Sequence, residues 1–317
     1  MRFQDLQGLA ALCIREGLPI HRLMLEEQAR ESGRTVRQEK MKMTDYYRVM
    51  KEAVRRGLTE DTRSRSGLTG NDAKQVEALR ESGAGMLGPL GDKALAYALA
   101  VSEVNASMGR IIATPTAGSC GVIPGVFVSA QEEFGWSDER MTEGLFTAGA
   151  LGYVIANRSF VSGAEGGCQA EIGSAVAMAA GALAELRGGT PEQAVHAVGL
   201  ALKNSLGLVC DPVGGLVEVP CIVRNGFGAV SAITAAQMAL AGVRSAIPSD
   251  EVIEAMREVG GAMPDKYRET ARGGLAATKT GKRIMEELHP RRHAKREEAA
   301  ASDEDGTGQG ASDKDAP

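Results

Sequence analysis

The sequence has few aromatic side chains and no long apolar run. Aromatic residues make up 4% of the 317 residues, so a core must be filled mainly by aliphatic and small side chains. The most apolar stretches, residues 172–186 and 230–243, are shorter than the ~20 apolar residues that a membrane-spanning helix needs. We therefore expect buried helices and no membrane association.

Positive charge is not in excess, and the first residues carry no secretion signal. A net charge of -5 gives no overall field that would attract phosphate backbones, so we expect no nucleic-acid partner. The N-terminal residues lack the basic and then apolar pattern of a signal peptide. The five cysteines are an odd number and cannot all form disulfides, so we expect a reducing cytoplasmic location.

The sequence is instead rich in glycine and alanine. Ala-rich runs with helical spacing alternate with segments that contain Gly and Pro, and alternating strand patterns are scarce. This pattern predicts an all-α fold. Residues 122–130 could form a short strand, but Pro124 and Gly125 argue against it. Thr190 before Pro191 predicts a helix start, and Ser249 predicts another.

Three regions are expected along the chain. Residues 1–57 contain two amphipathic helical runs, and a loop is predicted from Gly57 to Asp72 because Gly, Ser, Thr and Asp interrupt the helical pattern there. Residues 58–288 form the main helical domain. Residues 289–317 are charged and poor in apolar side chains, which predicts a disordered tail.

Four of the five cysteines lie in glycine-rich segments, and three of these share a setting. Cys168 follows two glycines, Cys210 precedes Asp211, and Cys221 follows Pro220. Each is expected in a loop or at the end of an element, where a metal could be bound. The chain has no CxxC pair, so the spacing matches neither zinc ribbons nor the ferredoxin run. Buried thiols without a metal remain the alternative, as we expect for Cys13 in its apolar helix.

The number of thiols matters if an iron–sulfur cluster is bound. Three thiolates on a cubane leave one iron without a protein ligand, and that iron can act as a Lewis acid towards a substrate oxygen. A cluster that only carries electrons usually has four thiolate ligands.

The segment from Arg110 to Gly125 has the composition of an anion-binding loop. It offers hydroxyls, backbone amides next to glycines and a turn held by proline; the residues are Thr114, Pro115, Thr116, Gly118, Ser119 and Gly121. A loop that caps a helix without any ligand is the alternative. Arg110 and Arg224 could each bind a carboxylate or form a structural ion pair.

Histidine is absent from these motifs. The four histidines, His21, His196, His289 and His293, all lie elsewhere. A proton-abstracting base would therefore be a lysine, a carboxylate, a hydroxyl or a group from another chain.

Three segments of the sequence resemble the signature segments of the iron–sulfur-dependent L-serine dehydratases, also called L-serine ammonia-lyases. They are NASMGRIIATPTAGSCGVIPG (105–125), SGAEGGCQAEIGSA (162–175) and CDPVGGLVEVPCIVRN (210–225). Residues 66–73 (SGLTGNDA) and 263–276 (MPDKYRETARGGLA) are similar to further family segments. The resemblance is closest to the alpha chain of the two-chain form, which works with a beta chain.

This resemblance implies an Ala/Gly-rich helical catalytic domain around a buried 4Fe–4S cluster. Cys168, Cys210 and Cys221 stand at the family's ligand positions, whereas Cys120 does not. The TPTAG loop, which consists of Thr114, Pro115, Thr116, Ala117 and Gly118, would help to hold the carboxylate of L-serine. The open iron would take the hydroxyl group, and the products would be pyruvate and ammonia.

The sequence departs from some family members in two ways. Certain single-chain relatives close the fourth iron site with a cysteine near the carboxyl end, but this chain ends in ASDKDAP; water or substrate is expected at that site. The length leaves no room for a beta domain, so we expect a separate beta chain and an oligomeric enzyme.

Two other functions remain open at this point. A pyridoxal-phosphate-dependent dehydratase would need a Schiff-base lysine, for which Lys203 is the candidate. The other is a non-enzymatic protein: the absence of a fourth ligand cysteine argues against an iron–sulfur electron carrier, whereas a helical interaction protein with incidental thiols stays open.

Overall fold

The computed structural model describes residues 1–290, and within them the chain is helical. The elements are α1 (Leu6–Glu16), α2 (Ile20–Ser32), α3 (Val36–Thr59), α4 (Asp72–Glu81), α5 (Gly88–Ala106), α6 (Val122–Phe134), α7 (Asp138–Arg158), α8 (Gly163–Gly166), α9 (Cys168–Leu186), α10 (Pro191–Ser205), η1 (Val213–Gly215), α11 (Cys221–Leu240), α12 (Ser249–Ala262), η2 (Asp265–Tyr267), η3 (Gly274–Ala277) and α13 (Lys279–Leu288). The described residues contain no strand, so the all-α prediction is confirmed. The tail is predicted for residues 289–317. Of these, residues 291–317 lie outside the described residues.

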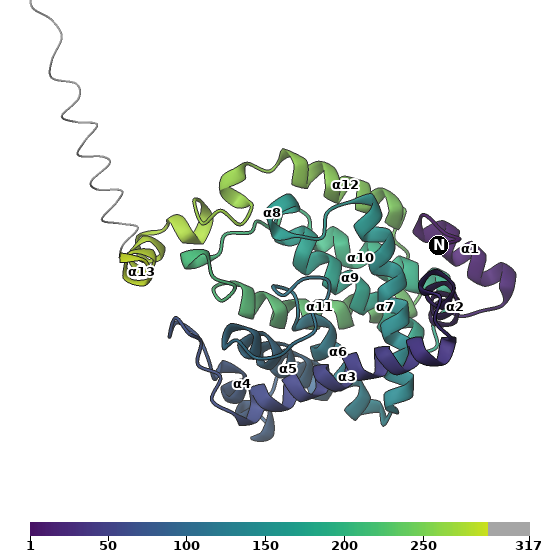
Figure 1. The fold of residues 1–317 in the computed structure, drawn as a ribbon, viewed down its shortest axis with the longest axis horizontal. Coiled ribbons are helices and arrows are strands. Elements are labelled where there is room, and N and C mark those ends of the chain that lie inside the picture. Colours follow the sequence, from purple (N-terminus) through teal and green to yellow (C-terminus); the bar gives the residue numbers. More distant parts are fainter. Residues whose placement is uncertain (291–317) are drawn as a thin grey trace, which may run out of the picture.

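Helix α9 lies at the centre of the fold. All of its residues are buried, and it packs against α6, α7, α10 and α11 (Figure 1). Small residues allow these close contacts: a Cβ atom at Gly181 would lie 2.3 Å from Leu151 Cδ1. A helix that is apolar on every face belongs in a core. Because Cys168 is its first residue, that thiol is carried into the interior of the molecule.

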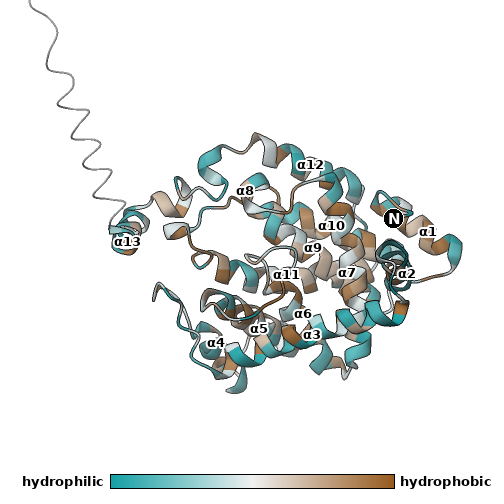
Figure 2. Cartoon of the chain, in the orientation of Figure 1, coloured by the Kyte–Doolittle hydropathy of each residue, from teal (hydrophilic) through white to brown (hydrophobic). Residues whose placement is uncertain are grey.

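The N-terminal helices pack on the main helical domain. Helix α2 contacts α7, and α3 lies along α5 and α7. Asp250 of α12 accepts hydrogen bonds from the backbone N–H groups of Leu6, at 2.9 Å, and Gln7, at 3.0 Å. These groups have no partner within α1, so a carboxylate from the far end of the chain caps that helix. Figure 2 shows hydrophilic colour on outer helices such as α3 and α4, and paler to hydrophobic colour on α9 and α11.

Both predicted helix starts are confirmed, whereas the possible strand and the predicted loop start are wrong. Helix α10 starts as expected, because the Thr190 side chain caps it and Pro191 is its first residue. The possible strand at 122–130 is wrong, since these residues form most of α6. The loop predicted from Gly57 begins only after Thr59. At Gly57 the helix instead packs closely on α5, where a Cβ atom would lie 2.4 Å from the Ala100 carbonyl oxygen.

The helix start predicted at Ser249 is confirmed. Helix α12 begins at this residue, but no side chain caps it, and Pro248 is the capping position. The Ser249 hydroxyl donates to the Val195 carbonyl oxygen at 2.6 Å, so it joins α12 to α10.

Within residues 1–290, no helix is long and apolar enough to cross a membrane.

Candidate functional site

Cys168, Cys210 and Glu171 form a buried group of possible metal ligands. The two Sγ atoms and a Glu171 carboxylate oxygen all lie within 4.8 Å of one another. Cys168 and Glu171 occupy the first turn of α9, and Cys210 lies between α10 and η1. The backbone of Cys210 is fixed by residues 267 and 269: its N–H donates to the Tyr267 carbonyl oxygen, and its carbonyl accepts from Glu269 N–H, both at 2.8 Å.

Cys221, the third predicted ligand, is not a member of this group, although its thiol interacts electrostatically with Cys168 and Glu171. It is the first residue of α11 and is 5% exposed. Burial raises the pKa of its thiol, and the charge of Cys168 raises it further. All three predicted cysteines therefore lie at an element end or in a loop, as expected, and all three are buried.

The thiols of Cys168 and Cys210 differ in their electrostatic setting. A hydrogen bond from Cys210 lowers the pKa of the Cys168 thiol, and the positive charge of Arg224 lowers it further, against the opposing effect of burial. The pKa of Cys210 is raised, because it is the donor in that hydrogen bond and is also buried. A thiolate is the metal-binding form of cysteine. The thiolate is therefore more accessible at Cys168 than at Cys210.

Arg224 is held in a structural position and is not free to bind a substrate bidentately. Its Nη1 donates to the Val209 carbonyl oxygen at 2.8 Å and to Cys168 Sγ at 3.3 Å. Its Nη2 donates to Asp211 Oδ1 at 2.9 Å. Arg110, the other arginine considered, is exposed at the surface.

The donor set and its surroundings suit a soft metal centre. Thiolates select iron–sulfur clusters and related soft metals, and the Arg224 charge offsets part of their negative charge. The backbone also leaves space for the sulfur atoms. A Cβ atom at Gly163 would lie 2.7 Å from Cys210 Sγ, so glycine is required there. The residues therefore fit the implied cluster.

The TPTAG loop lies against the same group of residues. The hydroxyl of Thr116 donates to Glu171 Oε1, and Gly118 lies against the same carboxylate, since a Cβ atom there would be 2.5 Å from Glu171 Oε1. Thr114 and Gly118 are buried, Pro115 and Thr116 are half-buried, and Ala117 is exposed. The peptide bond between Thr114 and Pro115 is cis. The loop leads directly into α6, where no side chain forms a capping hydrogen bond.

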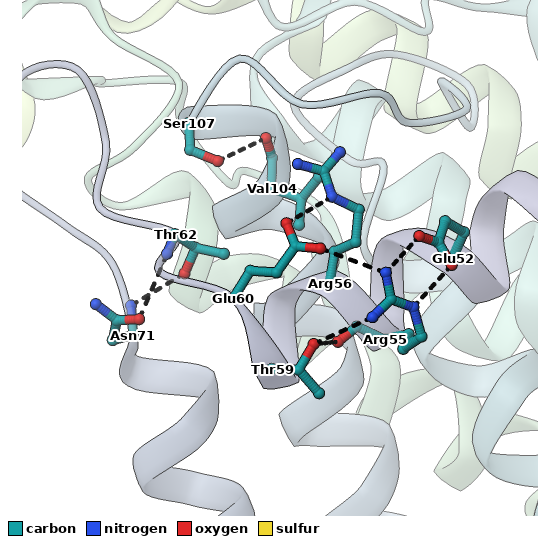
Figure 3. A network of polar contacts seen from close by, with 9 residues as sticks. All are labelled: Glu52, Arg55, Arg56, Thr59, Glu60, Thr62, Asn71, Val104 and Ser107. Carbon is teal, nitrogen blue, oxygen red and sulfur yellow. Dashed lines mark hydrogen bonds and ion pairs between the residues drawn. The ribbon is translucent and has the colours of Figure 1, made fainter.

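A second loop, residues 60–71, is tied to the segment before Cys221. The hydroxyls of Ser66 and Thr69 donate to Glu218 Oε2, at 2.7 and 2.9 Å. The ends of the loop are joined by Thr62 and Asn71, as Figure 3 shows: each backbone N–H donates to the other's side-chain oxygen. The SGLTGNDA segment thus lies beside the third predicted ligand.

Sequence reasoning missed Glu171, Glu218 and Asn225. Glu171 could have been noticed because a residue three positions after Cys168 shares its helix face. Nothing local indicates the partners of the other two. Glu218 accepts from Ser66, and Asn225 Nδ2 donates to the Gly118 carbonyl oxygen at 2.7 Å, and each pair is more than a hundred residues apart in the sequence.

The remaining thiols and the candidate lysine lie outside the ligand group. Burial raises the pKa of Cys13 and of Cys120 to about 12 in each case. Cys13 is in the core, as expected. Lys203 lies near the end of α10.

Comparison with known proteins agrees with this arrangement. The family model described as serine dehydratase alpha chain matches residues 15–276. The probable L-serine dehydratase alpha chain of Bacillus subtilis is 48% identical over 286 residues, which cover 90% of this chain and 95% of that protein. The L-serine dehydratase alpha chain of Peptoniphilus asaccharolyticus is 44% identical over 277 residues, or 87% and 95% of the two chains.

A third relative, from Streptomyces coelicolor, matches this chain over only part of its own length. Its L-serine dehydratase is 43% identical over 289 residues, which cover 86% of this chain but 60% of that protein. Together these matches define an enzyme of the carbon–oxygen lyase class, as predicted, and they exclude the non-enzymatic alternative. The chain belongs to the serine dehydratase alpha chain family.

Proposed function

We propose that this chain converts L-serine to pyruvate and ammonia, with a 4Fe–4S cluster held by Cys168, Cys210 and Cys221. The observation that carries the proposal is the meeting of Cys168 and Cys210 with Glu171 in a buried group, directly beside the TPTAG loop. Two of the three predicted ligands thus share a group with a residue that is hydrogen-bonded to the loop expected to hold the substrate carboxylate, which supports the proposal.

The reaction removes one molecule of water from L-serine. The Cα proton and the Cβ hydroxyl group leave, and the resulting aminoacrylate rearranges to an imine that is hydrolysed to pyruvate and ammonia. Hydroxide is a poor leaving group, and the cluster, when bound, would supply a Lewis acid for it. The chain's own residues bind and orient. Arg224 holds Cys168 and Asp211 in place, and the TPTAG loop binds the carboxylate.

We further propose that a beta chain completes the active site. The described residues place no histidine in the ligand group or in the TPTAG loop, so a proton-abstracting base could come from the partner. The names of the Bacillus and Peptoniphilus relatives, each an alpha chain, support a two-chain enzyme. All five cysteines are free thiols, which supports a reducing, cytoplasmic location.

The proposal can be tested by anaerobic purification of the chain, co-expressed with the beta chain. We expect about four iron and four sulfide ions per chain and pyruvate formation from L-serine. Cys168→Ser, Cys210→Ser and Cys221→Ser should each lose the cluster, whereas Cys120→Ser is the matched control that should keep it.

Three outcomes would contradict parts of this proposal. A cluster-loaded complex that forms no pyruvate from L-serine would overturn the substrate. Loss of iron in Cys120→Ser, with normal iron in Cys221→Ser, would overturn the ligand set. Activity that requires pyridoxal phosphate and disappears in Lys203→Ala would favour the other dehydratase class.

A further inference from the structure

The loop of residues 60–71, between α3 and α4 (Figure 1), is folded by its own hydrogen bonds. The Ser64 N–H donates to the Thr69 carbonyl oxygen at 2.9 Å, and the Ser64 hydroxyl accepts from the Thr69 N–H at 3.3 Å. Gly70 has a φ of +135°, and a Cβ atom there would lie 2.5 Å from Arg63 Cα. The loop is therefore a compact unit that can be fixed as a whole.

The base of this loop is anchored on α5 by a buried carboxylate. Glu103 is 0% exposed, and it accepts hydrogen bonds from the Thr62 hydroxyl at 3.0 Å and from the Asp72 N–H at 2.7 Å. The Asp72 N–H has no partner within α4, because it belongs to the first turn of that helix. This anchor therefore holds the base of the loop without involving any residue of the cysteine site.

A second buried carboxylate, that of Glu218, holds the rest of the loop. The residue is 5% exposed, and its Oε2 accepts from both the Ser66 and the Thr69 hydroxyls. Within residues 1–290, no lysine or arginine forms an ion pair with Glu218. The loop therefore supplies the donors that a buried carboxylate needs.

The backbone of Glu218 leads directly to the predicted ligand Cys221. Its carbonyl oxygen accepts from the Ile222 N–H at 2.9 Å, in the first turn of α11. Its own N–H donates to the Leu216 carbonyl oxygen at 2.8 Å. Glu218 is thus bonded to the loop through its side chain and, through its backbone, to the helical turn that Cys221 begins.

We propose that Glu218 is a positioning residue that couples the 60–71 loop to Cys221, so that the fixed loop helps the site to retain its cluster. This inference rests on the proposed cluster and adds a residue that supports one of its ligands. Coupling between two sites is reciprocal. If the loop steadies Cys221 when the cluster is bound, the bound cluster must also steady the loop.

Iron release measures the first half of this coupling. In the anaerobically purified complex of the full chain with its beta chain, Glu218→Ala should release iron to a chelator about 10- to 100-fold faster than wild type, since loss of a group that supports a metal ligand typically weakens metal binding by that factor. Glu218→Gln keeps an oxygen that can accept from both hydroxyls and should release iron at nearly the wild-type rate. Ser66→Ala combined with Thr69→Val removes the donors and should resemble Glu218→Ala, and joining all three substitutions should add little.

Glu39→Ala is the matched control, because it removes another buried glutamate that accepts from a serine hydroxyl. Glu39 is 4% exposed, accepts from Ser32 at 2.6 Å and lies in the first turn of α3, at the opposite end of that helix from the 60–71 loop. This substitution should leave the rate of iron release unchanged, even where it lowers the urea midpoint.

Hydrogen–deuterium exchange of the peptide covering residues 62–71 measures the other half. In wild type this peptide should exchange more slowly in the cluster-loaded complex than in the same complex after iron removal. In Glu218→Ala the difference should disappear, whereas it should persist in Glu218→Gln. A merely structural role of Glu218 would change the exchange equally with and without the cluster, and that result would contradict the coupling.

Other results would also overturn the proposal. Iron release at the wild-type rate in Glu218→Ala would refute it directly. Fast release in Glu218→Ala, but not in the Ser66→Ala, Thr69→Val variant, would assign the effect to α11 and leave the loop without a part in it. A wild-type complex that binds no iron would refute the proposed cluster and this role of Glu218 together. Neither measurement needs turnover, so a cluster-loaded complex that forms no pyruvate would refute the proposed reaction and still decide the role of Glu218.

Discussion

Two arginine–carboxylate networks in this molecule have similar geometry and opposite surroundings. At the end of α3, Arg55 lies 2.6 Å from Glu52 and 3.3 Å from Glu60 (Figure 3), and these side chains are 41–55% exposed. At the cysteine site, Arg224 lies 2.9 Å from Asp211, and their side chains are 16% and 5% exposed. The N–O distances do not distinguish the two networks. Any difference in their effect on stability must therefore come from burial.

Burial changes what each network does. Water and salt screen an exposed pair, so it contributes little to folding. A buried charge that loses its partner is left without solvation, so each member depends on the other. The buried network also reaches a cysteine and the η3 helix, because Arg224 contacts Cys168 and Asp211 accepts from Leu275 N–H at 2.8 Å. An arginine–carboxylate pair of the kind found on the surface of α3 therefore connects the elements of the cysteine site.

The largest effect is expected for Asp211→Ala. Breaking a buried ion pair typically costs about 3–5 kcal/mol of unfolding free energy, here because Arg224 keeps its charge without its carboxylate partner. Urea unfolding of the purified chain measures the loss. Asp265→Ala is the matched control, because Asp265 pairs with Arg268 at the surface; an equal loss there would show that burial is not the cause.

A double variant sharpens the same test. If the cost arises from the unpaired charge of Arg224, then Asp211→Ala combined with Arg224→Met should be more stable than Asp211→Ala alone. A double variant that is less stable would assign the loss to the hydrogen bonds of Arg224 with Val209 and Cys168.

The next prediction compares the replacement of glycine by alanine at two positions. Gly118→Ala would place a Cβ atom 2.5 Å from the Glu171 carboxylate, and such overpacking typically costs about 1–3 kcal/mol. Gly149→Ala in α7 meets nothing within 4 Å and should stabilise by up to about 1 kcal/mol, as is typical in a helix interior. Thermal unfolding of both variants checks this. Equal midpoints would contradict the tight contact between the loop and Glu171.

Two buried glutamates should give opposite pH dependences of stability. Burial raises the pKa of Glu103, so its contribution to stability is present below its ordinary value, about 4.5, and is lost as the pH rises through the folded value. For Glu27, hydrogen bonds from Arg2 outweigh burial and lower the pKa. Its contribution is present above the ordinary value and is lost as the pH falls through the folded value.

Glutamine variants isolate these two contributions. Relative to Glu103→Gln, wild type should lose unfolding free energy as the pH rises from about 4.5 towards neutrality. Relative to Glu27→Gln, wild type should lose it as the pH falls below about 4.5. Urea unfolding across this range measures both differences. Slopes of the same sign would show that one of the two carboxyl groups has been assigned the wrong environment.

The sequence predicted local features well because their causes lie within a few residues. The cap of α10 is an example, since Thr190, Pro191 and Gln193 are neighbours. The neighbours of Gly57 in the sequence predict a helix end there. A glycine is present instead because the backbone of Ala100, on another helix, approaches too closely for a Cβ atom. The ligand cysteines could be proposed by resemblance alone, whereas their spacing left buried thiols as an alternative. The roles of Glu171 and Asn225 required the fold, because their partners are 55 and 107 residues away.

The smallest effect is expected for Arg55→Ala, which removes the centre of the exposed network. Arg55 contacts only side chains at the surface end of α3, and its partners stay hydrated when it is lost, so no unsolvated charge remains. We expect an unchanged urea midpoint at high salt and unchanged pyruvate formation. A midpoint that drops as far as in Asp211→Ala would mean that the network of Figure 3 supports the loop from Thr62 to Asn71. Exposure would then no longer separate the two networks.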